Sequence, residues 1–413
     1  MTPRRVVITG IGAVTPVGHG HDGLWRGVLA NRSAVKAIDR FDPSPFPSRV
    51  AAQIDDFVPT DHLEPKRARR LDRFSQLAVA AARMAADDAQ LPLDGEGRDQ
   101  TGVFLGSALG GVAFGEEQHE AYVARGVRGV APTLALAVFG GAGASNIALD
   151  LDLRGPAVGN ANSCASGAVA IGQAFHAIRA GDMDAALAGA AEAPLAPLTF
   201  GAFAMIRVLS QRNGDPATAS RPFDADRDGF VMGEAAAVLA LEERTAAERR
   251  GAPILGELLG YGATNDAYHM TQPRPDGSQA ARAVRLALDD AALPPEAVGY
   301  VNAHGSSTVL NELAEARALH LALGEHGAGV PVSGTKGLYG HALGASGAVE
   351  AAICTLSLEH AALPGTCNLR TPDPACKLHV LTDALACRTD VVLSTSFGFG
   401  GMNAALLIGR YAG

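Results

Sequence analysis

The stretch GPAVGNANSCASGAVAIGQAFHAIRAG, residues 155–181, decides how this chain folds. It predicts a short extended run, a tight turn that holds Cys164, and a helix over about residues 165–180. Apolar residues occupy most of that helix, and only Gln173, His176 and Arg179 form a polar stripe at three-residue spacing. A helix that is apolar nearly all round is a buried helix. The sequence therefore places a cysteine at the first turn of a core helix.

Cys164 has the setting of a nucleophile. Free peptide N–H groups and the helix dipole favour an anion at a helix N-terminus, and thiols there ionise with a pKa of roughly 3.5–7.5 instead of about 8.5. Small neighbours such as Ser163, Ala165 and Gly167 also leave room for a substrate. The alternative is that Cys164 is only a small core residue, which is the common role of a free cysteine.

The composition indicates a protein with a large core. The chain has 413 residues, of which 47% are hydrophobic and 19% charged, so it can form two domains or one large duplicated domain, and global disorder is excluded. The net charge of −9 argues against broad binding of nucleic acid or an anionic membrane, although a local basic patch remains possible. Five cysteines without a CxxC motif indicate a reducing cytoplasm. We expect neither a signal peptide nor a membrane span.

Strand and helix patterns alternate along the chain, which predicts mixed α/β layers. The pentapeptide ASGAV occurs at 165–169 and again at 345–349, each time opening an apolar helix, which indicates a duplicated α/β unit. The predicted helices cover about 21–30, 72–90, 278–292 and 311–323. The predicted strands cover 5–10, 102–106, 184–191, 235–241, 254–265, 298–304 and 331–336, with two more within 391–409.

Two local motifs look like cofactor loops but fail in their spacing. The Gly10-Ile11-Gly12 run has Thr15 where a dinucleotide-binding GxGxxG motif needs its third glycine. The DADRDG run at 224–229 opens like a calcium loop, but its twelfth position is Ala235, where a bidentate Glu is required. We therefore expect neither a dinucleotide nor calcium at these places.

A thiolate nucleophile needs groups that manage protons and stabilise an oxyanion. His304 and His341 each end a buried run beside glycine, where a loop can present an imidazole to a pocket, although either could instead be a hydrogen-bonded structural residue. Lys336 is one of only four lysines in the chain, and Arg cannot replace a compact ammonium that must act at one point. Glu315, on the helix after His304, is a candidate partner.

Zinc is the rival use of these residues. A site made of Cys164, His304 and His341 would have three side-chain ligands on separated loops, at no recurring metal-site spacing. We expect no metal there.

Four segments carry a resemblance to a known family: NSCASGA around Cys164, VNAHGSST around His304, GTKGLYGHALGASGA around Lys336 and His341, and FGFGGMNAAL at 397–406. They look like the active-site signatures of elongating β-ketoacyl-acyl carrier protein synthases, most closely the KAS II type. The segments RRVVITGIGAVTPVG, SRPFDADRDGFVMGEAA and NDAYHMTQPRPDG also match in order and spacing. The similarity therefore extends over nearly the whole chain.

The resemblance implies a thiolase-like α/β fold in which duplicated mixed-sheet halves form an α-β-α-β-α layered arrangement. The N-terminal half would span residues 1–253 and carry the cysteine, and the C-terminal half would span 254–413 and carry the two histidines. The chain would act as a homodimer, or as a heterodimer with a homologous chain-length subunit.

The resemblance also implies a decarboxylative Claisen condensation. Cys164 would take an acyl chain from an acyl carrier protein or coenzyme A as a thioester. His304 and His341 would hydrogen-bond the thioester oxygen of malonyl carrier protein while carbon dioxide leaves, and the resulting enolate would attack the acyl group on Cys164. Backbone N–H groups of Cys164 and Phe399 would form the oxyanion hole.

Further residues receive supporting roles from the resemblance. Lys336 would orient His341 and its hydrogen-bond network, with Glu315 close by, and Phe399 would gate the acyl pocket. The enzyme would hold no cofactor of its own, because phosphopantetheine arrives on the acyl carrier protein and is met by Ser306 and Thr308. The implied substrate-binding residues are Leu109, Ser306, Thr308, Phe399, Gly400 and Met402.

The sequence departs from the family pattern near the pantetheine entrance and the gate. Ser306 and Met402 stand where the family usually has Thr, and Gly337-Leu338-Tyr339 stand where it has Ser-Met-Thr. These differences favour a dedicated ketosynthase of a type II polyketide or polyene pathway over primary fatty-acid synthesis. We expect it in the cytoplasm, with no nucleic-acid or membrane partner.

Three related classes fit the sequence less well. A thiolase needs a second cysteine in a C-x-G turn near the C-terminus, and none of the four later cysteines is followed in that way. A KAS III initiator would carry Asn where His341 stands. A non-condensing chain-length subunit would lack the nucleophile, whereas Cys164 is present.

Overall fold

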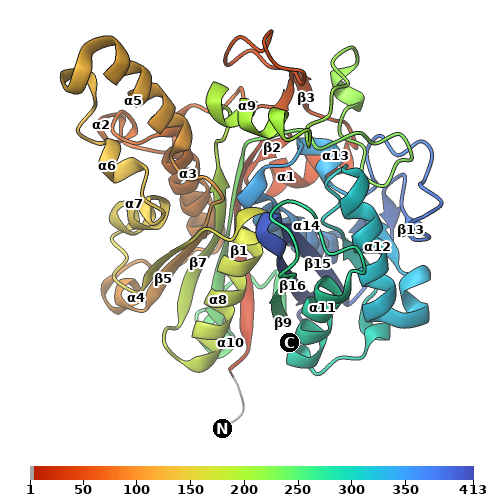
Figure 1. Cartoon of the computed structure of the whole chain (residues 1–413). Coiled ribbons are helices and arrows are strands. Elements are labelled where there is room, and N and C mark those ends of the chain that lie inside the picture. Colours follow the sequence, from red (N-terminus) through yellow and green to blue (C-terminus); the bar gives the residue numbers. More distant parts are fainter. Residues whose placement is uncertain (1–3) are drawn as a thin grey trace.

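A computed structural model describes residues 4–413, and Figure 1 shows its layers. The first three residues of the N-terminal half lie outside the described range. The main sheet has the strand order β13-β11-β10-β15-β16-β9-β1-β8-β7-β5-β6, with β2 paired to β1. The strands of the sheet are β1 (Val6–Thr15), β2 (Gly18–His19), β5 (Thr101–Gly106), β6 (Ala157–Asn160), β7 (Ala185–Glu192), β8 (Ala235–Glu243), β9 (Gly256–Asn265), β10 (Tyr300–Asn302), β11 (Pro331–Ser333), β13 (His379–Val380), β15 (Val391–Gly398) and β16 (Met402–Gly409).

The sheet consists of two halves with the same strand pattern. In the first half β1–β8 and β8–β7 pair antiparallel, and β7–β5 and β5–β6 pair parallel. In the second half β9–β16 and β16–β15 pair antiparallel, and β15–β10 and β10–β11 pair parallel. The halves join where β1 pairs with β9. The predicted duplication of a mixed α/β unit is therefore confirmed.

Two helices lie between the two halves of the sheet, which therefore form separate layers on either side of them. α8 (Ser166–Ala180) contacts β5 and β7 on one side and β9 and β16 on the other, and α14 (Ser346–His360) likewise contacts both halves. α3 (Arg73–Asp88) and α7 (Ala142–Leu151) cover the outer face of the first half, while α11 (Ser278–Ala291) and α12 (Val309–Leu323) cover that of the second. The five layers expected from the resemblance are present.

The repeated ASGAV segments explain how the middle helices approach each other so closely. A Cβ atom added to Gly167 would lie 2.6 Å from the backbone nitrogen of Ala348, and one added to Gly347 would lie 2.9 Å from that of Ala168. Only glycine permits this contact between α8 and α14. Each helix follows a 3₁₀ turn, η3 (Ser163–Ala165) before α8 and η7 (Leu343–Ala345) before α14.

The first strand is longer than predicted. β1 continues past Gly10, where the predicted strand ends, and it ends only at Thr15. A Cβ atom on Gly10 would lie 2.5 Å from the carbonyl oxygen of Ala85, and one on Gly12 would lie 1.9 Å from that of Ala81. These glycines therefore let α3 pack directly on the strand.

Smaller elements surround this frame, and no helix among residues 4–413 has both the length and the apolar character needed to cross a membrane. They are β3 (Val35–Ala37), β4 (Val50–Ala52), β12 (Ala362–Leu363), β14 (Leu385–Ala386), α1 (Gly20–Leu29), α2 (Pro65–Ala68), α4 (Gly95–Asp99), α5 (Val112–Arg125), α6 (Leu134–Ala137), α9 (Pro197–Met205), α10 (Arg244–Arg249) and α13 (Lys336–Tyr339), with the 3₁₀ turns η1 (Pro59–Asp61), η2 (Gly126–Gly129), η4 (Pro216–Thr218), η5 (Pro295–Ala297), η6 (Gly324–Ala328) and η8 (Phe399–Gly401).

Candidate active site

Cys164 lies in the η3 turn at the N-terminus of α8. Ser163 has φ 53°, a left-handed conformation that is uncommon for residues other than glycine. The end of β15 packs on this turn, because a Cβ atom added to Gly398 would lie 2.9 Å from the Cys164 nitrogen. Cys164 is 7% exposed, and it lines a cavity of about 310 Å³.

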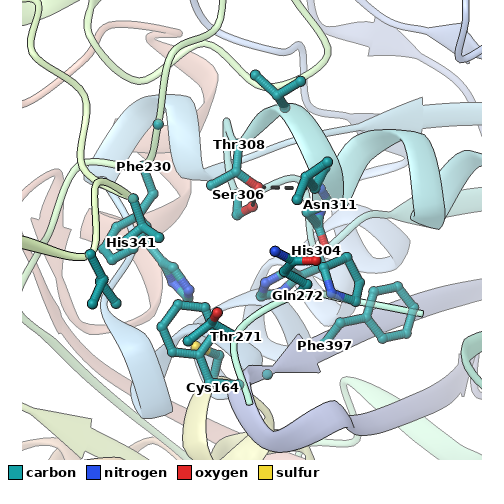
Figure 2. A pocket seen from close by; sticks show the side chains of 18 of the residues that line it. Cys164, Phe230, Thr271, Gln272, His304, Ser306, Thr308, Asn311, His341 and Phe397 are labelled. Carbon is teal, nitrogen blue, oxygen red and sulfur yellow. Dashed lines mark hydrogen bonds between the residues drawn. The ribbon is translucent and has the colours of Figure 1, made fainter. Parts of the chain in front are cut away.

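The same cavity receives both predicted histidines. His304 follows β10 and His341 follows α13, and Figure 2 shows their imidazoles facing the space above Cys164. The two ring centroids are 5.2 Å apart and the ring planes are nearly perpendicular, at 81°. The structure therefore brings a thiol and two imidazoles, which are far apart in sequence, into one cavity.

Lys336 contacts His304, not His341 as we expected. Its Nζ lies 2.5 Å from the His304 carbonyl oxygen and 3.4 Å from His304 Nδ1, and it also donates to Glu350 Oε1. An ammonium has three donors and no acceptor, so Nδ1 must be the acceptor. The ring proton of His304 is therefore on Nε2, which leaves Nε2 as a hydrogen-bond donor for a ligand.

His341 is held by α14 and by the segment that precedes β8. Its Nδ1 lies 2.9 Å from Ser346 Oγ. Its backbone N–H donates to Val231, and its carbonyl accepts from Gly233, at 2.7 and 3.0 Å. The Phe230 ring meets the imidazole edge-on, with centroids 5.2 Å apart. These contacts fix the position of the ring.

Glu315 holds the backbone beside His304. This buried carboxylate accepts from the N–H groups of His304 and Gly305 at 2.7 and 2.9 Å, and from Thr395 Oγ1 at 2.8 Å. Asn311 Nδ2 donates a fourth bond at 3.2 Å. The predicted proximity of Glu315 is correct, and its contact is with the loop and not with the imidazole.

Burial controls the charge of the three central groups. It lowers the pKa of His304 and of His341 well below 6.5, and the nearby Lys336 charge lowers both further. Burial also raises the pKa of Cys164 above 9.0, although the Ser163 hydroxyl, the Lys336 charge and the Phe399 N–H oppose this shift. Our expectation of an acidic thiol is therefore wrong, because the loss of solvent outweighs these favourable contacts.

Two buried carboxylates were missed from the sequence. Glu350 on α14 pairs with Lys336, and burial raises its pKa to about 7. Glu192, at the end of β7, accepts from Ser107 Oγ and from the N–H groups of Ala108, Leu109 and Gly344 at 2.7–3.1 Å. A lone carboxylate within an apolar run is the signal that could have found both, since unpaired buried acids are rare.

The predicted substrate residues divide into two groups. Ser306, Thr308 and Phe399 line the cavity at Cys164. The Ser306 and Thr308 oxygens are 3.0 Å apart, and the Phe399 ring stacks on Phe203 with centroids 6.2 Å apart. The cavity is also lined by Asp228, Thr271, Gln272, Val309, Leu310, Asn311 and Leu343.

Leu109, Gly400 and Met402 lie outside the lining of this cavity. Leu109 lines a second one of about 430 Å³, between α5 and the start of α9, although it also packs on the apolar cluster that contains Cys164. Gly400 donates its N–H to the Met270 carbonyl at 2.7 Å. The Met402 sulfur instead accepts weak contacts from two asparagine amides. None of these three residues lines the cavity at Cys164 where a substrate would lie.

The duplicated frame, the paired middle helices and one cysteine facing two histidines define a condensing enzyme of the thiolase-like class. Family models for the N-terminal and C-terminal domains of beta-ketoacyl synthases match residues 3–247 and 255–370. The chain therefore belongs to the β-ketoacyl synthase family, whose members are acyltransferases that elongate chains in fatty-acid or polyketide synthesis.

Full-length relatives agree with this assignment. The 3-oxoacyl-[acyl-carrier-protein] synthase 2 of Synechocystis sp. is 42% identical over 409 residues, which is 99% of this chain and 98% of the relative. The ishigamide ketosynthase/chain length factor structure superposes with a TM-score of 0.93 at 35% identity, with full coverage of both chains. A type II PKS ketosynthase in complex with its acyl-carrier protein superposes with a TM-score of 0.90 at 32% identity, covering 99% of this chain and 100% of that chain.

Proposed function

We propose that Cys164, His304 and His341 perform the condensation in sequence. Cys164 attacks an acyl thioester, and its proton leaves with the departing thiol. The malonyl thioester then occupies the space beside both imidazoles. The single observation that carries this proposal is that the three side chains line one cavity of about 310 Å³.

Neutral imidazoles suit decarboxylation. The carbon–carbon bond to the leaving carboxylate breaks, and its electron pair forms an enolate whose oxygen becomes negative. A donor aimed at that oxygen stabilises the transition state more than the ground state. His304 Nε2–H is such a donor, because Lys336 occupies Nδ1, and we assign the second donor to His341.

The enolate carbon then attacks the acyl carbonyl on Cys164. The tetrahedral intermediate places negative charge on the former carbonyl oxygen. The N–H groups of Cys164 and Phe399 lie where the η3 turn meets the end of β15, and the Phe399 N–H already contacts the thiol. We assign the oxyanion hole to these two groups. Collapse of the intermediate releases the sulfur, and no step draws on a bound cofactor.

We propose an acyl carrier protein as the source of both acyl groups, with a dedicated polyketide or polyene pathway as the setting. Relatives of this chain are named for such settings: a complex of a type II PKS ketosynthase with its carrier protein, and the ishigamide ketosynthase/chain length factor. We further propose a homologous chain-length subunit as the partner, because Leu109 and the second cavity lie on a surface rich in exposed apolar residues, including Val138 and Leu198.

A local basic surface supports carrier-protein docking. Lys66, Arg69 and Arg70 are exposed around α2, although the chain carries a net charge of −9. Complementary charge chiefly speeds association. Charge reversal at Lys66 or Arg70 should lower kcat/KM for acyl carrier protein about tenfold, and leave acylation by a small acyl thioester unchanged. Arg282→Glu, on the exposed face of α11, is the matched control.

The main test is intact-protein mass after incubation with saturated and polyenoyl carrier proteins, beside a Cys164→Ala control. We expect an acyl adduct on the parent enzyme only. The carrier protein that acylates Cys164 fastest would identify the pathway. Equal reaction with ordinary saturated donors would refute the dedicated pathway. If no adduct forms from any donor, with or without the paired subunit, while iodoacetamide still alkylates Cys164, the condensing role itself fails.

A further inference from the structure

A cluster of metal-ligating side chains lies away from the active site, where α1 meets the end of α14. His21 comes from the first turn of α1, and Glu359 and His360 are the last two residues of α14. One ligand atom from each residue lies within 4.8 Å of the other two. His21 Nε2 and Glu359 Oε2 are already 2.9 Å apart, whereas tetrahedral ligands about 2.05 Å from zinc are about 3.3 Å apart.

The other nitrogen of His21 has the partner that a metal-bound histidine usually has. His21 Nδ1 lies 3.0 Å from Asp88 Oδ2 on α3. Asp88 is itself fixed, because the same oxygen accepts from the Ile11 N–H at 2.8 Å. A carboxylate on Nδ1 sets the tautomer and turns the lone pair of Nε2 outward. The Nε2 atom faces Glu359 and already shares a hydrogen bond with its carboxylate, so a bound cation would displace the proton between these two atoms.

His360 is also oriented in advance. Its ring stacks on Trp25, with centroids 5.1 Å apart and planes at 10°. Glu359 and His360 are both exposed, so small movements of their side chains can bring the three ligand atoms to the spacing of a tetrahedral site. The carbonyl end of α14 adds a partial negative charge, which favours a cation.

We propose that His21, Glu359 and His360 bind one divalent cation of the zinc class. Two imidazoles and one carboxylate suit zinc and its borderline neighbours cobalt and nickel. The coordination leaves a fourth position for water. Such an ion would join α1, α3 and α14 at the end of the helix opposite Ser346, which contacts His341. Its role is structural, and it is independent of the condensation.

The chain supplies its own reporter, because Trp25 is its single tryptophan and it stacks on a proposed ligand. The experiment titrates Co²⁺, then Zn²⁺ in competition, into a Cys164→Ala enzyme, so that the catalytic thiol takes no metal. We expect saturable quenching of Trp25 fluorescence at one ion per chain, with visible absorption typical of tetrahedral Co²⁺. Zinc should reverse both signals.

Three variants test the assignment. His360→Phe keeps the ring on Trp25 and removes the ligand, and His21→Gln removes the second imidazole, so each should abolish saturable quenching. Asp88→Asn should weaken binding about 10–100-fold through the loss of ligand orientation. His379→Phe, at an exposed histidine on β13, should leave the titration unchanged. Quenching that does not saturate, or that persists in His360→Phe, would show that the three residues form only a hydrogen-bonded bridge between helices.

Discussion

Replacing Lys336 by Met tests whether one ammonium sets the tautomer of His304. Lys336 is fully buried, and its three donors contact the His304 carbonyl, His304 Nδ1 and Glu350. Methionine is similar in length but donates no hydrogen bond. The variant therefore removes the charge and the contact to Nδ1 with little change in volume.

The stability change follows from the partner left behind. Breaking a buried ion pair by removing one member costs roughly 3–5 kcal/mol, because the other charge stays uncompensated. Burial already raises the pKa of Glu350 to about 7, and the Lys336 charge opposes that rise. In the variant Glu350 takes up a proton at neutral pH, so we expect a loss of about 3 kcal/mol in the free energy of unfolding.

A double variant separates stability from catalysis. Lys336→Met with Glu350→Gln leaves no buried charge, and we expect its stability within about 1 kcal/mol of the parent, since exchanging a whole buried pair is often neutral. Both variants should condense roughly 10²–10³-fold more slowly, the effect of losing one oxyanion donor. Urea unfolding measures the first quantity. Single-turnover condensation on enzyme acylated beforehand at Cys164 measures the second.

One result would contradict the role assigned to Lys336 at His304. If the double variant regains stability and also condenses at the parent rate, Lys336 serves only to pair with Glu350. The tautomer argument for His304 would then be wrong. Acylation of Cys164, followed separately by mass, is the control for a general loss of structure.

Three further predictions follow from burial and packing. Because burial raises the pKa of Cys164, the rate of its alkylation by iodoacetamide should still be rising with pH at pH 9.0. Lys336→Met should slow alkylation further, because it removes a charge that lowers this pKa. An alkylation rate that becomes level below pH 9.0 would contradict the raised pKa. Because the two active-site imidazoles have pKa values well below 6.5, the condensation rate of the acylated enzyme should not fall as pH is lowered through 6.5. Each imidazole should contribute a decrease in the free energy of unfolding below pH 6.5, by up to about 1.4 kcal/mol per pH unit, because the unfolded chain binds a proton there that the folded chain does not. Glu350, whose pKa burial raises to about 7, contributes in the opposite direction over the same range. Gly167→Ala should destabilise the protein by about 1–3 kcal/mol, because its Cβ would lie 2.6 Å from the Ala348 nitrogen. Gly115→Ala on α5, where the nearest atom is 3.7 Å away, should instead stabilise the protein by about 0.5–1 kcal/mol. Equal effects of the two variants in urea unfolding would contradict the packing of α8 on α14 as the cause.

Sequence reasoning succeeded where a local pattern carries the information. The turn at Cys164, the glycine beside each active-site histidine and the ASGAV repeat all lie within short segments, and the structure places them as the patterns indicate. It failed where the decisive contact joins distant segments. Nothing near Lys336 shows that its ammonium reaches His304, 32 residues away in the chain, and helix periodicity does not reveal that Glu350 faces it.

The chemistry of Cys164 shows the same limit. A helix N-terminus is visible in the sequence and predicts an acidic thiol. The degree of burial, which reverses the direction of the pKa shift, depends on the end of β15 and on the loops that close the cavity. Likewise, the resemblance implies that Leu109 is a substrate-binding residue, but only the packing of α5 and α9 shows that Leu109 lines a second cavity.

The η7 turn shows what duplication did to the two copies of the nucleophile turn. Leu343 has φ 41°, as Ser163 has φ 53° in η3, and the residue that follows it, in the place of Cys164, is Gly344. A Cβ atom there would lie 2.4 Å from the Ala108 nitrogen and 2.7 Å from Glu192 Oε2. A Gly344→Cys exchange therefore cannot create a second nucleophile without expelling that carboxylate. The η3 turn carries the nucleophile, whereas the equivalent η7 turn packs against Ala108 and Glu192, so the two similar halves hold a single reaction centre.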